Sequence, residues 1–109
     1  MYTLLSENDR HALDELNKKV RDLYLKKEYS LCEDLIKEAM SSYPHAAHPH
    51  NLYGILLERE GNQHGAMCHY RAANALEPTY IPARYNLYRY GDFSNKEKPA
   101  FTVEECTRQ

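Results

Sequence analysis

The residues between His50 and Pro78 constrain the fold of this chain more than any other stretch. They read His50-x-x-Tyr53-Gly54-x-x-Leu57, then Gly61, then Ala66-x-x-x-Tyr70, Ala73 and Pro78. Small and large apolar residues recur at helical spacing, and Gly61 separates the two halves. This order is typical of two helices that fold back on each other with closely approaching backbones. The stretch therefore predicts a helical hairpin.

The spacing resembles the tetratricopeptide repeat (TPR), a helix-turn-helix unit of about 34 residues with the pattern W-x2-L-G-x2-Y…A-x3-F…P. When the sequence is shifted by 34 residues, similar residues coincide: Pro44 falls on Pro78 and Ala39 falls on Ala73. The match is weaker in the first unit, where Lys27 stands at the position of Gly61. His50 stands where the family usually has Trp.

The resemblance implies an all-α fold, a TPR-like antiparallel helix-turn-helix stack of about five helices in a short right-handed superhelix. Residues 1–91 would form the domain, with repeats at about 13–46 and 47–80 and a closing helix at about 81–90. Residues 92–109 are expected to be a polar, flexible tail, with a last helical turn near 103–107 as the alternative. An unrelated antiparallel helical array is the alternative for the whole fold.

The charge and composition indicate neither a nucleic-acid-binding nor a membrane protein. A formal net charge of −2 on 109 residues gives no basic patch for phosphates or anionic lipids. The chain has no apolar run of about 20 residues, and its first residues lack the pattern of a signal peptide. Three cysteines, an odd number without a C-x-x-C pair, are typical of a reducing compartment. We therefore expect a cytoplasmic protein.

In the TPR family the first helix of each unit lines a concave groove that takes a peptide. Carried over to this chain, that face would include Asp14, His48, Glu58 and Asn86. The residues we expect to contact a peptide are Asn17, Arg21, Tyr24, Asn51, Ile55, Arg59, Tyr85 and Arg89. Asn can bond a peptide backbone, Arg can pair with a carboxylate, and Tyr supplies flat contact area. The Lys/Asn/Arg clamp that some family members use for chaperone tails is not present as such, because Leu52 replaces its second Asn.

The resemblance implies a non-enzymatic protein–protein interaction module, an adaptor or scaffold that binds a peptide segment in this groove. The excess of Arg on the face suggests an acidic or carboxylate-bearing peptide. The alternative is an assembly protein that self-associates, for instance as a homodimer, through exposed helix faces. Under either hypothesis Phe93 and Phe101 of the tail could pack into the groove as a self-ligand.

Histidines and cysteines invite a metal-site hypothesis that the sequence does not favour. His45, His48 and His50 lie close together, and His64, Cys68 and His69 follow on the next predicted helix. Imidazole and thiolate suit zinc or copper. However, His50 takes a packing position of the repeat, and adjacent residues of a helix point apart. We therefore expect no metal and no cofactor.

The sequence also lacks the motifs of the common enzyme classes. It has no Gly-rich phosphate loop, no G-x-S-x-G and no H-E-x-x-H. Cys32 shifts onto Ala66 in the repeat, which indicates a small packing residue rather than a nucleophile. We expect no catalytic residues and no enzymatic activity.

Overall fold

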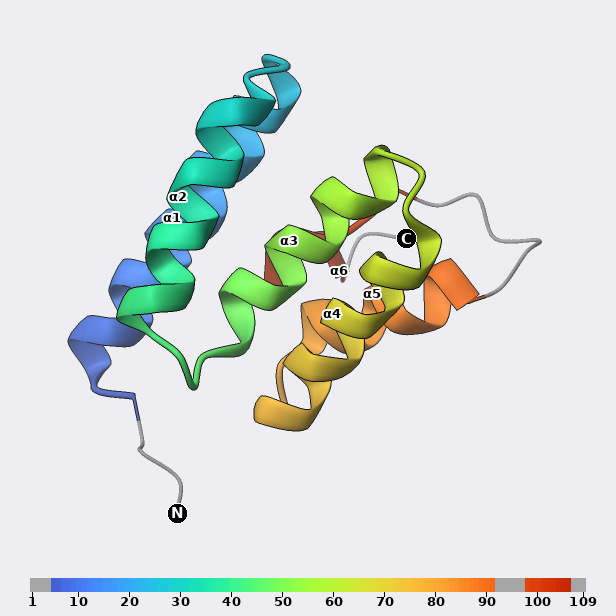
Figure 1. Ribbon diagram of the computed structural model, residues 1–109. Coiled ribbons are helices and arrows are strands. Elements are labelled where there is room, and N and C mark those ends of the chain that lie inside the picture. The colour runs from blue at the N-terminus through green and yellow to red at the C-terminus, as the bar shows by residue number, and fades with distance from the viewer. Residues whose placement is uncertain (1–4, 92–97, 107–109) are drawn as a thin grey trace.

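The computed structural model describes residues 5–91 and 98–106, and this part of the chain contains α-helices and no β-strand. Successive helices along the domain run in opposite directions (Figure 1). The helices are α1 (Glu7–Leu25), α2 (Tyr29–Ser42), α3 (Ala47–Arg59), α4 (Gln63–Leu76), α5 (Ile81–Gly91) and α6 (Val103–Cys106). The predicted all-α class is therefore confirmed.

Side-chain caps and prolines set the helix ends. The Ser6 hydroxyl accepts from the Asp9 backbone N–H at 3.0 Å while the Asp9 carboxylate accepts from the Ser6 N–H at 3.2 Å, a capping box at the start of α1. Asn62 caps α4 by accepting from the Gly65 N–H at 2.9 Å. Helices α2 and α4 both stop one residue before the residue that precedes a proline, since proline disfavours helical geometry in its predecessor.

Several helix boundaries recur at an interval of 34 residues. Helix α1 ends at Leu25 and α3 at Arg59, while α2 and α4 share the same length of 14 residues. The turns recur as well, because Lys27 has a φ of 64° and Gly61 a φ of 83°. Lys27 thus adopts the left-handed conformation that glycine supplies in the second turn without steric cost.

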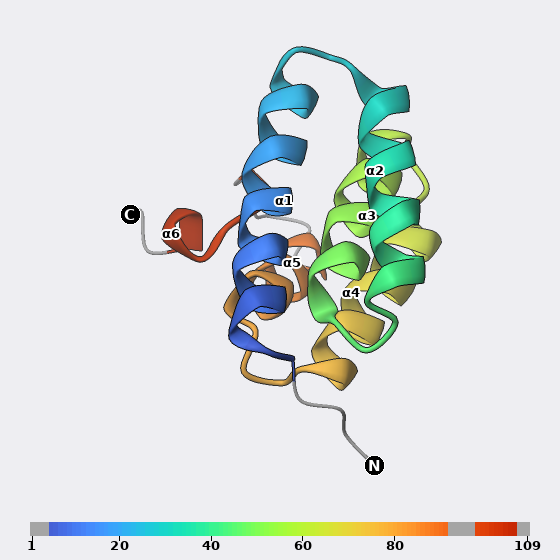
Figure 2. The same cartoon turned by 90° about the vertical axis from the view of Figure 1, so that its left-hand side faces the viewer.

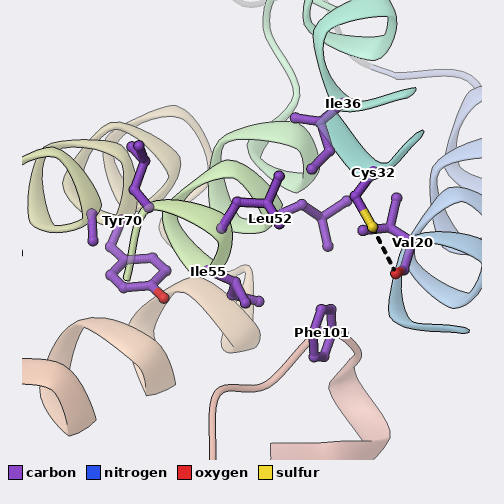
Figure 3. Close-up of a cluster of buried hydrophobic side chains, with 10 residues drawn as sticks. Val20, Cys32, Ile36, Leu52, Ile55, Tyr70 and Phe101 are labelled. Carbon is purple, nitrogen blue, oxygen red and sulfur yellow. Dashed lines mark hydrogen bonds between the residues drawn. The ribbon is translucent and has the colours of Figure 1, made fainter. Parts of the chain in front are cut away.

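Helix α3 is the centre of the molecule. Of its 13 residues, nine are buried, and it packs against α1, α2, α4 and α5. Figure 3 shows part of the surrounding apolar cluster, in which side chains from α1, α2, α3 and α4 meet. Its buried members are Val20, Cys32, Ile36, Leu52, Ile55, Leu56, Leu57, Ala66, Tyr70 and Phe101.

Gly54 of α3 packs directly against the ring of Tyr70 of α4. A Cβ atom at this position would lie 2.6 Å from Cε1 of the fully buried Tyr70 ring. Since no side chain fits between the two, glycine is required for this packing. The pairing of a small residue with a large aromatic one is what the sequence between His50 and Pro78 predicted.

The C-terminal part of the described chain lies against the helices. We expected a flexible tail at residues 92–109; of this range the structure describes residues 98–106 and buries Ala100, Phe101 and Thr102. Burial of the Phe101 ring is worth about 1.5–3 kcal/mol by the hydrophobic effect, which gives this segment a reason to dock. Phe93 and residues 107–109 lie outside the described residues.

Candidate functional site

Helices α1, α3 and α5 contribute to one face, which we call the inner face and define by Asn17, Tyr24, Asn51, Ile55, Asn86 and Arg89. Residues 98–106, called the tail segment below, lie across it. Its helix α6 lies beside α1 in Figure 2 and behind α3 in Figure 1. Every one of the three helices contributes contacts to the tail segment, as described next.

Two asparagines hold the backbone of Ala100. The Asn86 carboxamide accepts from the Ala100 N–H at 2.8 Å and donates to the Ala100 C=O at 2.9 Å. Asn51 donates to the same carbonyl at 3.1 Å, and its own Oδ1 accepts from Asn86 at 2.8 Å. Both asparagines are completely buried. The inner face therefore satisfies the N–H and C=O groups of Ala100 with side-chain amides.

Phe101 lies in an apolar pocket of the inner face. Its ring makes an edge-to-face contact with Tyr24, with 5.1 Å between the ring centroids. The ring belongs to the apolar cluster that includes Val20 and Ile55, and Figure 3 shows it directed toward them from the tail segment. The position before it, Ala100, is 1% exposed, so the site has no room for a larger side chain there.

The tail segment organises its own turn beyond Phe101. The Glu105 carboxylate accepts from the backbone N–H groups of Phe101 at 2.8 Å and Thr102 at 3.0 Å. This is a capping interaction at the start of α6, and it gives the segment a fixed shape. The Cys106 thiol donates to the Thr102 carbonyl at 3.7 Å, and burial, reinforced by the nearby Glu105, raises the pKa of Cys106 to about 11.

An ion pair between Glu58 of α3 and Arg89 of α5 joins these two helices on the inner face. The Arg89 guanidinium bonds both carboxylate oxygens of Glu58, at 2.6 and 2.9 Å, in the bidentate geometry that favours such pairs. The Tyr70 hydroxyl of α4 donates to Glu58 at 2.7 Å. Burial and the Glu58 charge raise the pKa of Tyr70, which keeps it a donor. Arg89, expected to meet a peptide, therefore contacts Glu58 within the domain.

A second polar cluster lies at the other end of the inner face. Asn17 donates to the Tyr80 hydroxyl at 2.9 Å, and the His48 ring packs on Tyr80 with 4.2 Å between centroids. Burial lowers the pKa of His48 to about 4, so this ring is neutral at pH 7. Asn17, together with Thr102 and Val103 of the tail segment, lines a cavity of about 120 Å³.

The other predicted contact residues lie apart from the tail segment or at its edge. Arg21 is partly exposed and lies 3.5 Å from its neighbour Asp22. Arg59 is exposed and stacks on the ring of Tyr29, 3.7 Å from its centroid. Tyr85 is half-buried on α5. Of the eight predicted residues, Asn51, Tyr24 and Ile55 thus contribute most directly to the docking of the tail segment.

The fold places His45, His48 and His50 in three different surroundings. His45 is exposed, His48 is buried against Tyr80, and His50 pairs with His69 through their Nδ1 atoms at 3.0 Å. Burial lowers the pKa of both His50 and His69. Within residues 5–91 and 98–106, no group of three or more His, Cys, Asp or Glu side chains is placed to hold a metal ion.

The cysteines of the described chain are free thiols. Cys32 is fully buried and donates to the Val20 carbonyl at 3.5 Å, as Figure 3 shows. Burial raises the pKa of the Cys32 thiol, which disfavours the reactive thiolate. The interpretation of Cys32 as a packing residue agrees with this environment.

Sequence reasoning placed Asn86 on the expected face but did not choose it as a contact residue. A shift of 34 residues from Asn51 falls on Tyr85, one residue before Asn86. Helices α1, α3 and α5 each carry an asparagine on this face, namely Asn17, Asn51 and Asn86, and this recurrence could have indicated Asn86 as a contact residue. Nothing in the sequence marks Ala100 as the residue whose backbone is held.

Comparison with known protein families, with curated proteins and with solved structures finds no significant match to this chain. No helix in the described part of the chain has both the length and the apolar character needed to cross a membrane.

Proposed function

We propose that this chain is a TPR-like, non-enzymatic interaction module whose inner face binds a peptide segment of a protein partner. The observation that carries the proposal is the docking of the tail segment: Asn51 and Asn86 bond its backbone and an apolar pocket takes Phe101. In peptide recognition, hydrogen bonds to the backbone give affinity, and a buried aromatic anchor contributes much of the binding energy.

The repeat arrangement is part of this proposal. It is supported by the 34-residue recurrence of helix ends and of the positive-φ residues Lys27 and Gly61. The close packing of Gly54 on Tyr70 fits the small-and-large pattern of such units. In a stack of this kind the first helices line one surface, which here is the inner face.

A preference for acidic peptides would depend on Arg21 and Arg59. Arg89 is 5% exposed and its charge is balanced by Glu58, so it offers little to a ligand carboxylate. Arg21 and Arg59 retain exposed surface near the Tyr24 end of the inner face. The contribution of these two arginines to the affinity for an acidic peptide should therefore be modest and should decrease with added salt.

Selection of a displayed random-peptide library on the full chain tests this function. Recovered peptides should bind the parent protein and lose affinity for the Asn51→Ala/Asn86→Ala variant, whose helix content is checked by circular dichroism. Failure to recover any peptide, or equal binding to the folded double variant, would refute the proposal.

Light scattering tests the competing role in assembly. The proposal expects the mass of a monomer, 12.8 kDa, over the concentration range used for peptide binding. A dimer whose mass does not change on dilution would favour self-association instead.

A further inference from the structure

The two asparagines recognise peptide groups rather than a side chain. Asn86 engages both the N–H and the C=O of Ala100, which requires a residue with a free N–H and therefore excludes proline at this position. Asn51 adds a second donor to the same carbonyl. Any chain with a non-proline residue whose backbone lies as that of Ala100 does could make the same three bonds.

Side-chain selectivity comes from two neighbouring positions. Ala100 is 1% exposed between the helices, so the residue held by the asparagines must be small. Phe101 is 5% exposed and meets the Tyr24 ring edge-to-face, so the next residue is best aromatic. The inner face thus selects a small residue followed by an aromatic one.

Most other residues of the tail segment are exposed or shape its turn. Lys98, Val103 and Glu104 are exposed. Glu105 acts inside the segment, where it caps the turn of Thr102, and so shapes the ligand. The buried part of the tail segment is thus three consecutive residues, Ala100 to Thr102, and its cysteine, Cys106, is a free thiol.

We propose that the inner face recognises partner segments that carry a small residue followed by an aromatic residue, and that the tail segment competes with them for this face. This inference rests on the proposed function and specifies its ligand. The tail segment is attached to the same chain, so its effective concentration at the face is in the millimolar range for a short connection. A partner must displace it, and displacement uncovers Asn51, Asn86 and the Phe101 pocket together.

Fluorescence anisotropy with a labelled peptide of the sequence of residues 98–105 tests this competition. The full-length Phe101→Ser variant, whose own segment lacks the anchor, should bind the peptide at least about tenfold more tightly than the parent protein. The Lys98→Gln variant changes an exposed residue of the same segment and is the matched control, so it should bind like the parent. Equal affinity of the Phe101→Ser and parent proteins for the peptide would overturn the proposal.

Two altered peptides test the selectivity on the same Phe101→Ser protein. Replacement of Phe101 by Ala in the peptide, or of Ala100 by Glu, should weaken binding at least about tenfold, because the first loses the anchor and the second does not fit. Undiminished binding of either peptide would refute the small–aromatic preference while leaving peptide binding itself intact. Loss of all peptide binding, including that of selected library peptides, would instead refute the proposed function.

Circular dichroism shows whether the variants keep the helical fold. If Phe101→Ser loses helix content, Ala100→Pro replaces it, since that change removes the N–H that Asn86 accepts and leaves the aromatic ring in place. A folded Ala100→Pro protein must then show the same gain in peptide affinity. If neither variant folds, the tail segment is an integral part of the core, and the proposal is wrong.

Discussion

The carboxamide of Asn86 bonds both the N–H and the C=O of Ala100, at 2.8 and 2.9 Å, inside a fully buried network. One side chain thus replaces the strand partner that an extended residue would have in a β-sheet. Through this pairing the helical domain holds a piece of non-helical chain without leaving its peptide groups unsatisfied.

Replacement of Asn86 by Ala should be among the most destabilising changes on the inner face. It removes the partners of Ala100 N–H and of Asn51 Oδ1, and we expect a loss of about 2–4 kcal/mol in the free energy of unfolding. Urea denaturation measures this. Asn62→Ala, which removes the α4 cap, is the comparison and should cost about 1 kcal/mol. A smaller loss of stability for Asn86→Ala than for Asn62→Ala would contradict the stabilising role of the hydrogen bonds among Asn51, Asn86 and Ala100.

Glu58→Gln should destabilise the protein by about 2–4 kcal/mol, because it removes the negative charge that the buried Arg89 guanidinium bonds in the bidentate pair. The change keeps the size of the side chain and an acceptor for the Tyr70 hydroxyl. Urea unfolding at low and at 0.5 M added salt should give similar losses, since a buried pair is weakly screened. The exposed pair of Glu33 and Lys37 offers the control, and Glu33→Gln should leave the urea midpoint unchanged. Equal effects of the two changes would show that the Glu58–Arg89 pair contributes no more to stability than an exposed pair.

The two positive-φ turns predict opposite effects of exchanging glycine. Lys27→Gly should stabilise the protein by about 0.5–1 kcal/mol, because glycine adopts the φ of 64° without the steric cost of a side chain. Gly61→Ala should destabilise it by about 1 kcal/mol, because alanine is strained at the φ of 83°. The new methyl group would have no atom within 4 Å, so no packing contact would offset this strain. Thermal unfolding measures both. A destabilising Lys27→Gly would show that the turns are not equivalent.

His48 should make the protein less stable in acid. Burial lowers its pKa in the folded state to about 4 from 6.5, so between these values the unfolded chain binds more protons. The stability is fully present above pH 6.5 and falls as the pH drops toward 4, by on the order of 2–3 kcal/mol from this residue. Asp14 lies 3.8 Å away but is largely exposed, so solvent screens its charge and it does not offset the burial.

His48→Gln isolates this contribution from those of His50 and His69, whose pKa values are also lowered by burial. The free energy of unfolding of the variant should depend less on pH between 4.5 and 7.5 than that of the parent. The same dependence in both proteins would show that His48 is not the cause.

The fold followed from the sequence where side-chain size and spacing carried the information. Gly54, Tyr70 and the prolines at 44 and 78 predicted the hairpins, since each acts through local geometry. Lys27 shows the limit of this reasoning, because a lysine gives no local signal of the left-handed turn that the packing imposes. Its equivalence to Gly61 appears only through the repeat spacing.

The candidate site was harder to predict, because its contacts join residues that are distant along the chain. The predicted Asn51 and Tyr24 do meet the tail segment, since their place on the first helices is fixed by periodicity. The partnership of Arg89 with Glu58 depends on the distance between α3 and α5, which the sequence does not reveal. The same holds for the docking of Ala100 on Asn86.

The central claim is that the tail segment docks on the inner face, and proton NMR tests it most directly. In the full-length protein, nuclear Overhauser effects should connect the Phe101 ring to the Tyr24 ring, whose centroids lie 5.1 Å apart, and to the Val20 methyl groups of the same cluster. Assigned Phe101 resonances without any effect to Tyr24 or Val20 would contradict the account.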